Sequence, residues 1–228
     1  MGHRTTGMFI AAAALAWPHC ALASDDQQVW LTAASTISLN DSVKVSQETI
    51  LRFGNDRGGL YEIETNLLLG TRVSRHLGIW AGYTHDLLYN GGRFARLERR
   101  GRQQITLDDL VKLGPGTLSL RFRLEERWRD GQQGTAWRAR PFVRFQIPLG
   151  TRRKWGALVL SHESFVAFNR TGFQAQVGED RMRNLVVLRV PVLPHVQAEA
   201  GYMNQYLFVR GGEDHVDHAA SLGLNFTF

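Results

Sequence analysis

The chain has 228 residues, of which 27 are Lys or Arg and 21 are Asp or Glu, giving a formal net charge of +6 at pH 7. This length fits one domain, and a single cysteine, Cys20, excludes a disulfide framework and a cysteine metal site. The basic residues neither cluster on a helix nor accompany a recognised motif, so we expect no nucleic-acid partner.

Residues 1–23 have the pattern of a secretory signal peptide. His3 and Arg4 precede an apolar stretch over residues 8–17, which is too short to span a bilayer as a helix. Ala21 and Ala23, on either side of Leu22, then offer a small-residue cleavage site. We therefore expect an exported chain with one domain over residues 24–228, which loses Cys20 with the signal.

From residue 29 onward, apolar and polar residues alternate with the period of β-strands. Eleven such runs can be counted, whereas a membrane barrel with both chain ends on one side needs an even number. Counting back from the C-terminus gives ten consistent spans from about Val43. The run around Trp30 is then an amino-terminal strand, an inward-folded piece, or one of twelve strands.

The connections between these runs alternate between short and long, as in outer-membrane barrels with short periplasmic turns and long external loops. Residues 74–77, 113–116 and 193–195 read as short turns, whereas 90–101, 129–135 and 169–180 read as long loops. Pro141 and Pro191 each remove a backbone donor from a closed sheet, so we expect bulges or strand ends there.

Residues 90–102 contain Arg93, Arg96, Arg99, Arg100 and Arg102, with Glu98 as the only acid. If this segment is an external loop, its guanidinium groups would meet lipopolysaccharide phosphates. A loop kept solvated by its own charge is the alternative.

Arginine and glutamate fill the polar face of several predicted strands. Leu118, Leu120 and Phe122 share one face of the run 117–129, and charged residues share the other. The same division elsewhere predicts these lumen-lining residues: Glu48, Arg52, Arg121, Arg123, Glu125, Arg127, Arg138, Arg140, Arg144, Glu163, Arg181, Arg183, Arg189 and Glu199. Such a wall of arginine could select anions, or glutamates could neutralise it and plug the barrel.

His162 and Ser164 are the only residues that suggest catalysis. At i and i+2 on a strand they point the same way, and they share the face of Leu160 and Val166, which would be exposed to lipid. Small outer-membrane lipid hydrolases carry a His and a Ser in such positions. No acid or amide that would orient His162 is identified from the sequence, so a non-catalytic polar pair is favoured.

Residues 213–218 contain Glu213, Asp214, His215, Asp217 and His218, which could bind a divalent metal. Their spacing fixes no coordination geometry, so a solvated loop is favoured and no metal or cofactor is expected.

The last run, residues 215–228, alternates down to Phe228. A C-terminal strand that ends on Phe is what outer-membrane barrels present to the barrel-assembly machinery. The last strand of a soluble sandwich or lipocalin-like barrel would show the same alternation.

Several segments in order resemble an uncharacterised family of bacterial outer-membrane proteins, domain of unknown function 2490. They are Trp30, residues 48–52, the arginine stripe 121–129, Glu163 with Phe165 and Asn169, Arg181, and the pair Gly201 and Tyr202. The resemblance implies a barrel and an outer-membrane location but no activity.

We therefore predict an all-β fold, a transmembrane antiparallel up-and-down β-barrel of 10 to 12 strands in the outer membrane of a Gram-negative bacterium. Its expected partners are outer-membrane lipid, lipopolysaccharide and the barrel-assembly machinery. The favoured function is structural or that of a narrow, porin-like pore. The alternatives are an anion-selective channel for acidic small solutes and a membrane-embedded lipid hydrolase or acyltransferase.

Overall fold

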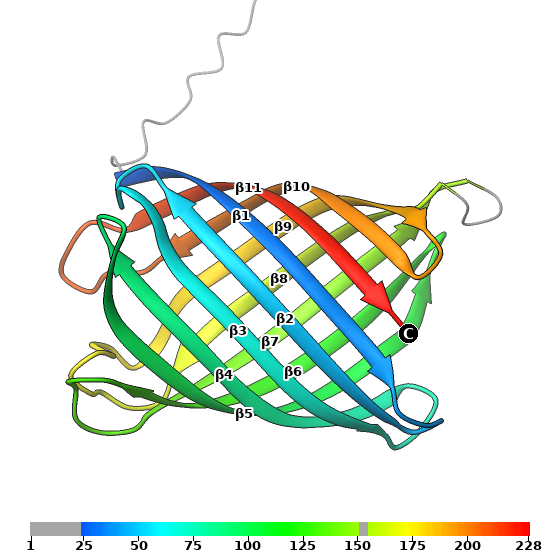
Figure 1. Ribbon diagram of the computed structural model, residues 1–228, viewed down its shortest axis with the longest axis horizontal. Helices are drawn as coiled ribbons and strands as arrows, with labels where there is room; N and C mark the ends of the chain where they lie inside the picture. Colours follow the sequence, from blue (N-terminus) through cyan, green and yellow to red (C-terminus); the bar gives the residue numbers. More distant parts are fainter. Residues whose placement is uncertain (1–23, 151–154) are drawn as a thin grey trace, which may run out of the picture.

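The computed structural model describes residues 24–150 and 155–228, and the predicted signal, residues 1–23, lies outside them. The described residues form an all-β, closed barrel, as predicted, and the barrel has eleven strands rather than an even number (Figure 1). No helix within these two ranges is long and apolar enough to cross a membrane. The strands are β1 (Ser24–Ser38), β2 (Val43–Gly54), β3 (Gly59–Arg72), β4 (Leu77–Asn90), β5 (Arg93–Leu113), β6 (Gly116–Arg129), β7 (Ala136–Pro148), β8 (Ala157–Ala167), β9 (Gly178–Leu193), β10 (Val196–Leu207) and β11 (His215–Thr227).

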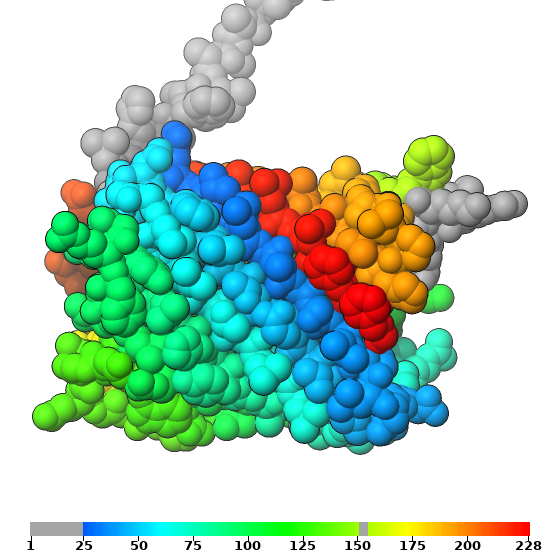
Figure 2. Space-filling model, in the orientation of Figure 1, coloured from blue at the N-terminus to red at the C-terminus, as the bar shows by residue number. Residues whose placement is uncertain are grey.

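The barrel closes between its first and last strands, β1 and β11, which run parallel. Their pairing extends from Ser24 opposite His215 to Thr36 opposite Thr227, whereas the other neighbouring strands are antiparallel. Figures 1 and 2 show β1 in blue beside β11 in red along this seam. The segment around Trp30 is therefore a full member of the barrel.

An odd number of strands places residues 24 and 228 at opposite ends of the barrel, so the expectation that both chain ends share one side was wrong. We call the end at residue 24 the amino-terminal rim; it carries the connections 55–58, 91–92, 130–135, 168–177 and 208–214. The carboxyl-terminal rim, at residue 228, carries 39–42, 73–76, 114–115, 194–195 and the described residues 149–150 and 155–156 between β7 and β8. The predicted short turns all lie at the carboxyl-terminal rim, as expected.

The prediction of a long loop over residues 90–102 was wrong. Gly91 and Gly92 alone connect β4 to β5, with φ of 55° and 75°. Two consecutive positive φ values suit the tight hairpin turn that glycine permits. Three residues assigned to the loop are instead buried in the barrel, namely Glu98, Arg100 and Arg102.

Both prolines lie at irregular positions, as predicted. The pairing of β7 with β8 is interrupted at Arg140 and Pro141. The register of β9 and β10 shifts beside Pro191, between Val196 and Gln197. The missing backbone donors are thus accommodated by local breaks in the ladders.

The barrel is polar inside and apolar outside. Charged and polar residues outnumber hydrophobic ones among the buried side chains. Leu67, Leu69, Phe122 and Leu188, by contrast, expose about half of their surface on the outer wall. Hydrophobic packing inside is confined to small clusters, such as Trp30 with Met203 and Ala219. This polarity is the reverse of that found in a soluble domain.

Candidate functional site

The charged residues that were predicted to line the lumen all lie on strands. Each of them is buried or half-buried. Those that are nearly inaccessible to solvent are Arg52, Arg123, Glu125, Arg127, Arg138, Arg140 and Glu163. Those that are half-buried are Glu48, Arg121, Arg144, Arg181, Arg183, Arg189 and Glu199. Together they form the wall and the filling of the lumen.

Glu125 is the centre of the filling. Its carboxylate accepts hydrogen bonds from Arg138 at 2.5 and 3.0 Å and from Arg140 at 2.7 Å, both on the neighbouring strand β7. Arg140 also donates to Glu163 on β8 at 3.1 and 2.8 Å. Arg102 and Arg123 approach Glu125 at 3.8 Å. Alternating charges across four adjacent strands, β5 to β8, thus form one continuous network.

Glu98 forms a second centre nearer the amino-terminal rim. It accepts hydrogen bonds from Arg100 at 2.7 Å, from Arg127 at 2.9 and 3.1 Å, and from Arg129 at 2.5 and 2.9 Å. This centre was not predicted from the sequence, because residues 90–102 have the composition of a loop.

Three carboxylates, of Glu62, Glu64 and Asp86, lie within 4.8 Å of one another. Arg52 pairs with both glutamates, and Arg100 pairs with Asp86 and, at 3.3 Å, with Glu64. Two guanidinium groups thus pair with the three carboxylates, so the protein itself neutralises the charge of this cluster only in part.

Aromatic rings give the buried arginines a second kind of partner beside the carboxylates. Phe165 is almost completely buried, and four guanidinium groups lie over its ring, those of Arg140 at 4.3 Å, Arg183 at 4.7 Å, Arg138 at 5.0 Å and Arg181 at 5.5 Å. The guanidinium carbons of Arg52 and Arg183 lie 4.2 and 4.7 Å from the centre of the Trp30 ring. These contacts stabilise cations in a water-poor lumen.

A cavity lies on each side of the filled middle. The first, about 280 Å³, is lined by residues that include Trp30, Arg121, Arg183, Arg189 and Glu199. The second, about 590 Å³, opens toward the amino-terminal rim and is lined by Arg127, Arg129, Arg138, Arg170, Arg181 and Arg210, with Asp180 as its acid. The two cavities share no lining residue.

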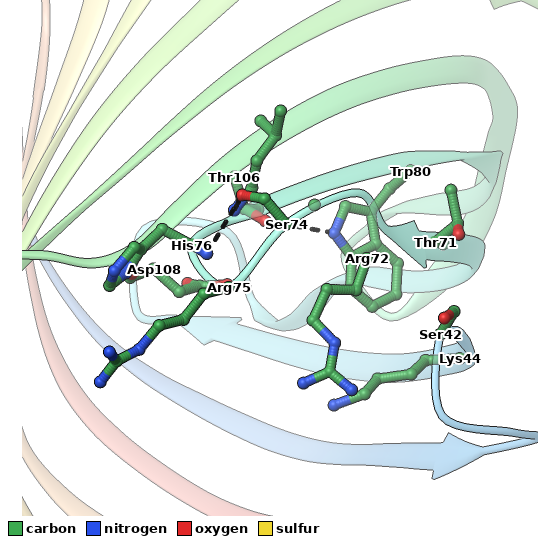
Figure 3. Close-up of a pocket in the computed structure, with 13 residues that line it drawn as sticks. Ser42, Lys44, Thr71, Arg72, Ser74, Arg75, His76, Trp80, Thr106 and Asp108 are labelled. Carbon is green, nitrogen blue, oxygen red and sulfur yellow. Dashed lines mark hydrogen bonds between the residues drawn. The ribbon is translucent and has the colours of Figure 1, made fainter.

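A smaller pocket of about 70 Å³ lies at the carboxyl-terminal rim (Figure 3). Lys44, Arg72 and Arg75 line it, and Trp80 donates a long hydrogen bond of 3.4 Å to Thr106.

The residues of the segment 213–218 do not converge on one point. His215 and Asp217 face inward and contact each other at 2.9 Å, whereas His218 lies on the outer face against Tyr202 at 2.5 Å. Asp214 is held by Tyr206 at 2.7 Å and by the backbone of Val209. The alternation of the strand therefore separates the candidate metal ligands.

His162 and Ser164 lie on the outer face of β8, as predicted, with His162 Nε2 at 3.2 Å from Ser164 Oγ. No orienting group for His162 was identified from the sequence, but the structure contains one. Asn184 lies directly opposite on β9, and its Oδ1 is 2.7 Å from His162 Nδ1. The pairing of β8 with β9, which brings Asn184 there, was not predicted from the sequence.

Comparison with known proteins gives a family but no activity. A family model described as "Protein of unknown function (DUF2490)" matches residues 27–216. An uncharacterised protein of Methylorubrum extorquens is 30% identical over 201 residues, which cover 87% of this chain and 86% of that protein. No solved structure matches the chain.

Proposed function

Because the chain belongs to the family of unknown function DUF2490, we propose its role from its own geometry: it is a bacterial outer-membrane β-barrel with a lumen closed by ion pairs. Residues 1–23 would direct its export, and β11, which is followed by Phe228, would engage the barrel-assembly machinery. In this proposal the carboxyl-terminal rim faces the periplasm.

The observation that carries the proposal is the reversed polarity of the barrel. Side chains such as Arg52, Glu98 and Glu125 have at most 1% of their surface exposed, whereas Leu67, Leu69 and Phe122 expose more than half of theirs. An apolar outer wall of this extent is costly in water and favourable in hydrocarbon. A soluble lipocalin-like barrel would require the opposite arrangement.

The closed middle supports a structural role rather than that of an open pore. Glu125, Arg138 and Arg140 are each less than 5% exposed and bridge adjacent strands. An ion crossing the lumen would have to separate buried pairs whose isolated charges are poorly solvated. We therefore infer that the barrel is rigid and does not conduct in this conformation.

Lipopolysaccharide is the proposed partner at the amino-terminal rim. Arg93 and Arg96 follow the tight turn at this rim and are exposed. Guanidinium groups there suit the phosphates of an outer leaflet, because they bind phosphate in bidentate fashion.

An anion-selective channel for acidic small solutes is the second candidate. The arginine-rich cavity at the amino-terminal rim favours it, because six arginines and one acid line that cavity. Such a cavity would concentrate anions at the entrance even if the path is closed below.

One set of measurements tests these proposals. The mature chain should fractionate with outer membranes, require detergent for extraction, and migrate differently before and after heating. Purified protein in planar bilayers should show no stable current. A steady anion-selective current, lost in a variant with Arg121, Arg140 and Arg183 replaced by Gln, would establish the channel instead. Recovery of folded protein in the soluble fraction without detergent would overturn the membrane location.

A further inference from the structure

Three polar side chains come together on the apolar outer wall, from the neighbouring strands β8 and β9. Ser164 Oγ lies 3.2 Å from His162 Nε2, and His162 Nδ1 lies 2.7 Å from Asn184 Oδ1. The order is hydroxyl, imidazole, then an orienting group, with each contact at hydrogen-bond distance. It is the arrangement of a nucleophile, a general base and a positioning residue.

The contact with Asn184 determines which imidazole nitrogen carries the proton. An amide oxygen only accepts, so His162 donates from Nδ1, which leaves Nε2 unprotonated. Nε2 can then accept the proton of the Ser164 hydroxyl. This is the tautomer that a general base needs, and the opposite one would leave Ser164 without a base.

The surroundings of the triad are apolar and irregular. Leu160 and Val166 occupy the same face of β8. The ladder to β7 is interrupted opposite this segment, and the register with β9 shifts between Phe165 and Val166. Breaks of this kind re-aim side chains and occur often beside active sites.

The depth of Ser164 suits a lipid ester. β8 ends at Ala167, toward the amino-terminal rim. A rise of about 3.3 Å per residue and a tilt of about 40° put Ser164 roughly 8 Å from that strand end. Acyl chains are joined to their headgroups near the boundary between the hydrocarbon core and the headgroup layer, so their ester carbonyls would come within reach.

We propose that Ser164, His162 and Asn184 form a lipid-facing site that hydrolyses acyl esters of membrane lipids. This inference uses the membrane location of the proposed function and adds a chemical activity to it. Ser164 and His162 are the catalytic residues, and Asn184 is a positioning residue.

The reaction proceeds in two balanced steps. Ser164 Oγ attacks the ester carbonyl carbon while His162 Nε2 takes the hydroxyl proton. The bond from the carbonyl carbon to the alcohol oxygen then breaks, and His162 returns its proton to the departing lysolipid alcohol. Water next attacks the acyl-serine with His162 accepting its proton, and the fatty acid leaves as Ser164 recovers that proton.

The first test measures covalent labelling and turnover with the folded, full-length mature protein. A fluorophosphonate probe should label the wild type, and a fluorogenic diacyl phosphatidylcholine in mixed micelles should be hydrolysed. Ser164→Ala should abolish labelling and lower turnover by at least about 1000-fold, as should His162→Ala. Ser161→Ala is the matched control, because Ser161 lies on the same strand but faces the inner cavity; it should leave both signals unchanged.

The second test asks whether Asn184 positions the imidazole of His162 for catalysis or only packs against it. Asn184→Ala should lower kcat on the order of 100-fold with little change in KM, since the imidazole loses its tautomer and orientation. Asn184→Asp should restore the activity, because a carboxylate oxygen accepts the same hydrogen bond. If the three polar groups only form hydrogen bonds with one another, Asn184→Ala would not lower kcat and Asn184→Asp would have no activity to restore.

The outcomes distinguish this inference from the proposed function. A wild type that is membrane-inserted and heat-modifiable, yet neither labelled nor active, would overturn the inference alone. Turnover that survives in Ser164→Ala would do the same. A protein recovered as a soluble species would instead overturn the membrane location.

Discussion

Glu98 and Glu125 are each shared by several arginines, so single carboxylates of this kind should contribute strongly to the stability of the barrel. Glu125 has no exposed surface and bonds to Arg138 and Arg140. Neutralising it leaves the buried Arg138 without the carboxylate it pairs with, whereas Arg140 keeps Glu163. An uncompensated buried charge is strongly destabilising. Glu126, the next residue, points to the outer face and contacts Gln103 at 3.3 Å.

Substituting Glu125 and Glu126 in turn compares a buried carboxylate with one on the outer face. Glu125→Gln should lower the free energy of unfolding by about 3–5 kcal/mol, the cost of breaking a buried ion pair from one side. Glu126→Gln should change it by less than about 1 kcal/mol. Urea titration in detergent micelles, followed by tryptophan fluorescence, measures both. Equal effects of the two substitutions would show that Glu125 is not the centre of the network.

For single residues, the sequence predicts which face of a strand a side chain occupies but not which side chain it will contact. Period-two alternation assigns Arg121, Arg140 and Glu163 to one side of their strands without any knowledge of neighbours. Which carboxylate meets which arginine depends on the register between strands. Asn184 illustrates the limit, because the loop 168–177 and a bulge between β8 and β9 decide that it lies opposite His162.

Among whole elements, β1 and β5 depart most from expectation. In β5 the outward positions Arg99, Gly101 and Gln103 are not apolar, so the alternation that identifies a membrane strand is hidden there. β1 could be recognised as a strand, but its parallel partner could not be inferred from local pattern. The alternation of residues describes one strand at a time, so it cannot show which two strands pair to close the barrel.

The parallel seam can be tested by disulfide trapping. In the observed register Ala33 lies opposite Leu224, whereas Val29 lies opposite Ala220. In a Cys20→Ser background, Ala33→Cys with Leu224→Cys should therefore form an intramolecular disulfide on mild oxidation. Val29→Cys with Leu224→Cys should not, because a disulfide needs Cα atoms within about 7 Å. Electrophoresis without reductant distinguishes the crosslinked chain.

The control pair is chosen to oppose the observed direction. An antiparallel seam centred on the same residues, Leu31 and Leu222, would bring Val29 opposite Leu224 instead. Crosslinking of that pair, without crosslinking of Ala33→Cys to Leu224→Cys, would contradict the parallel closure.

For the molecule as a whole, the odd strand number has a topological consequence. β1 and β11 run side by side in the same direction, so Asp25 lies at the amino-terminal rim and Thr227 at the carboxyl-terminal rim (Figure 1). If the barrel spans a membrane, these two positions are on opposite sides of it. A ten- or twelve-stranded barrel would place both chain ends on the same side.

Cysteine labelling in intact cells checks this arrangement in a Cys20→Ser background. A maleimide too large to cross the outer membrane should label Asp25→Cys on whole cells. It should label Thr227→Cys only after the outer membrane is permeabilised, because the carboxyl-terminal rim faces the periplasm in the proposed orientation. Both residues are exposed at their rims, so accessibility and not burial limits the reaction. Equal labelling of the two positions would contradict the eleven-stranded topology, and the reverse order would contradict the proposed orientation alone.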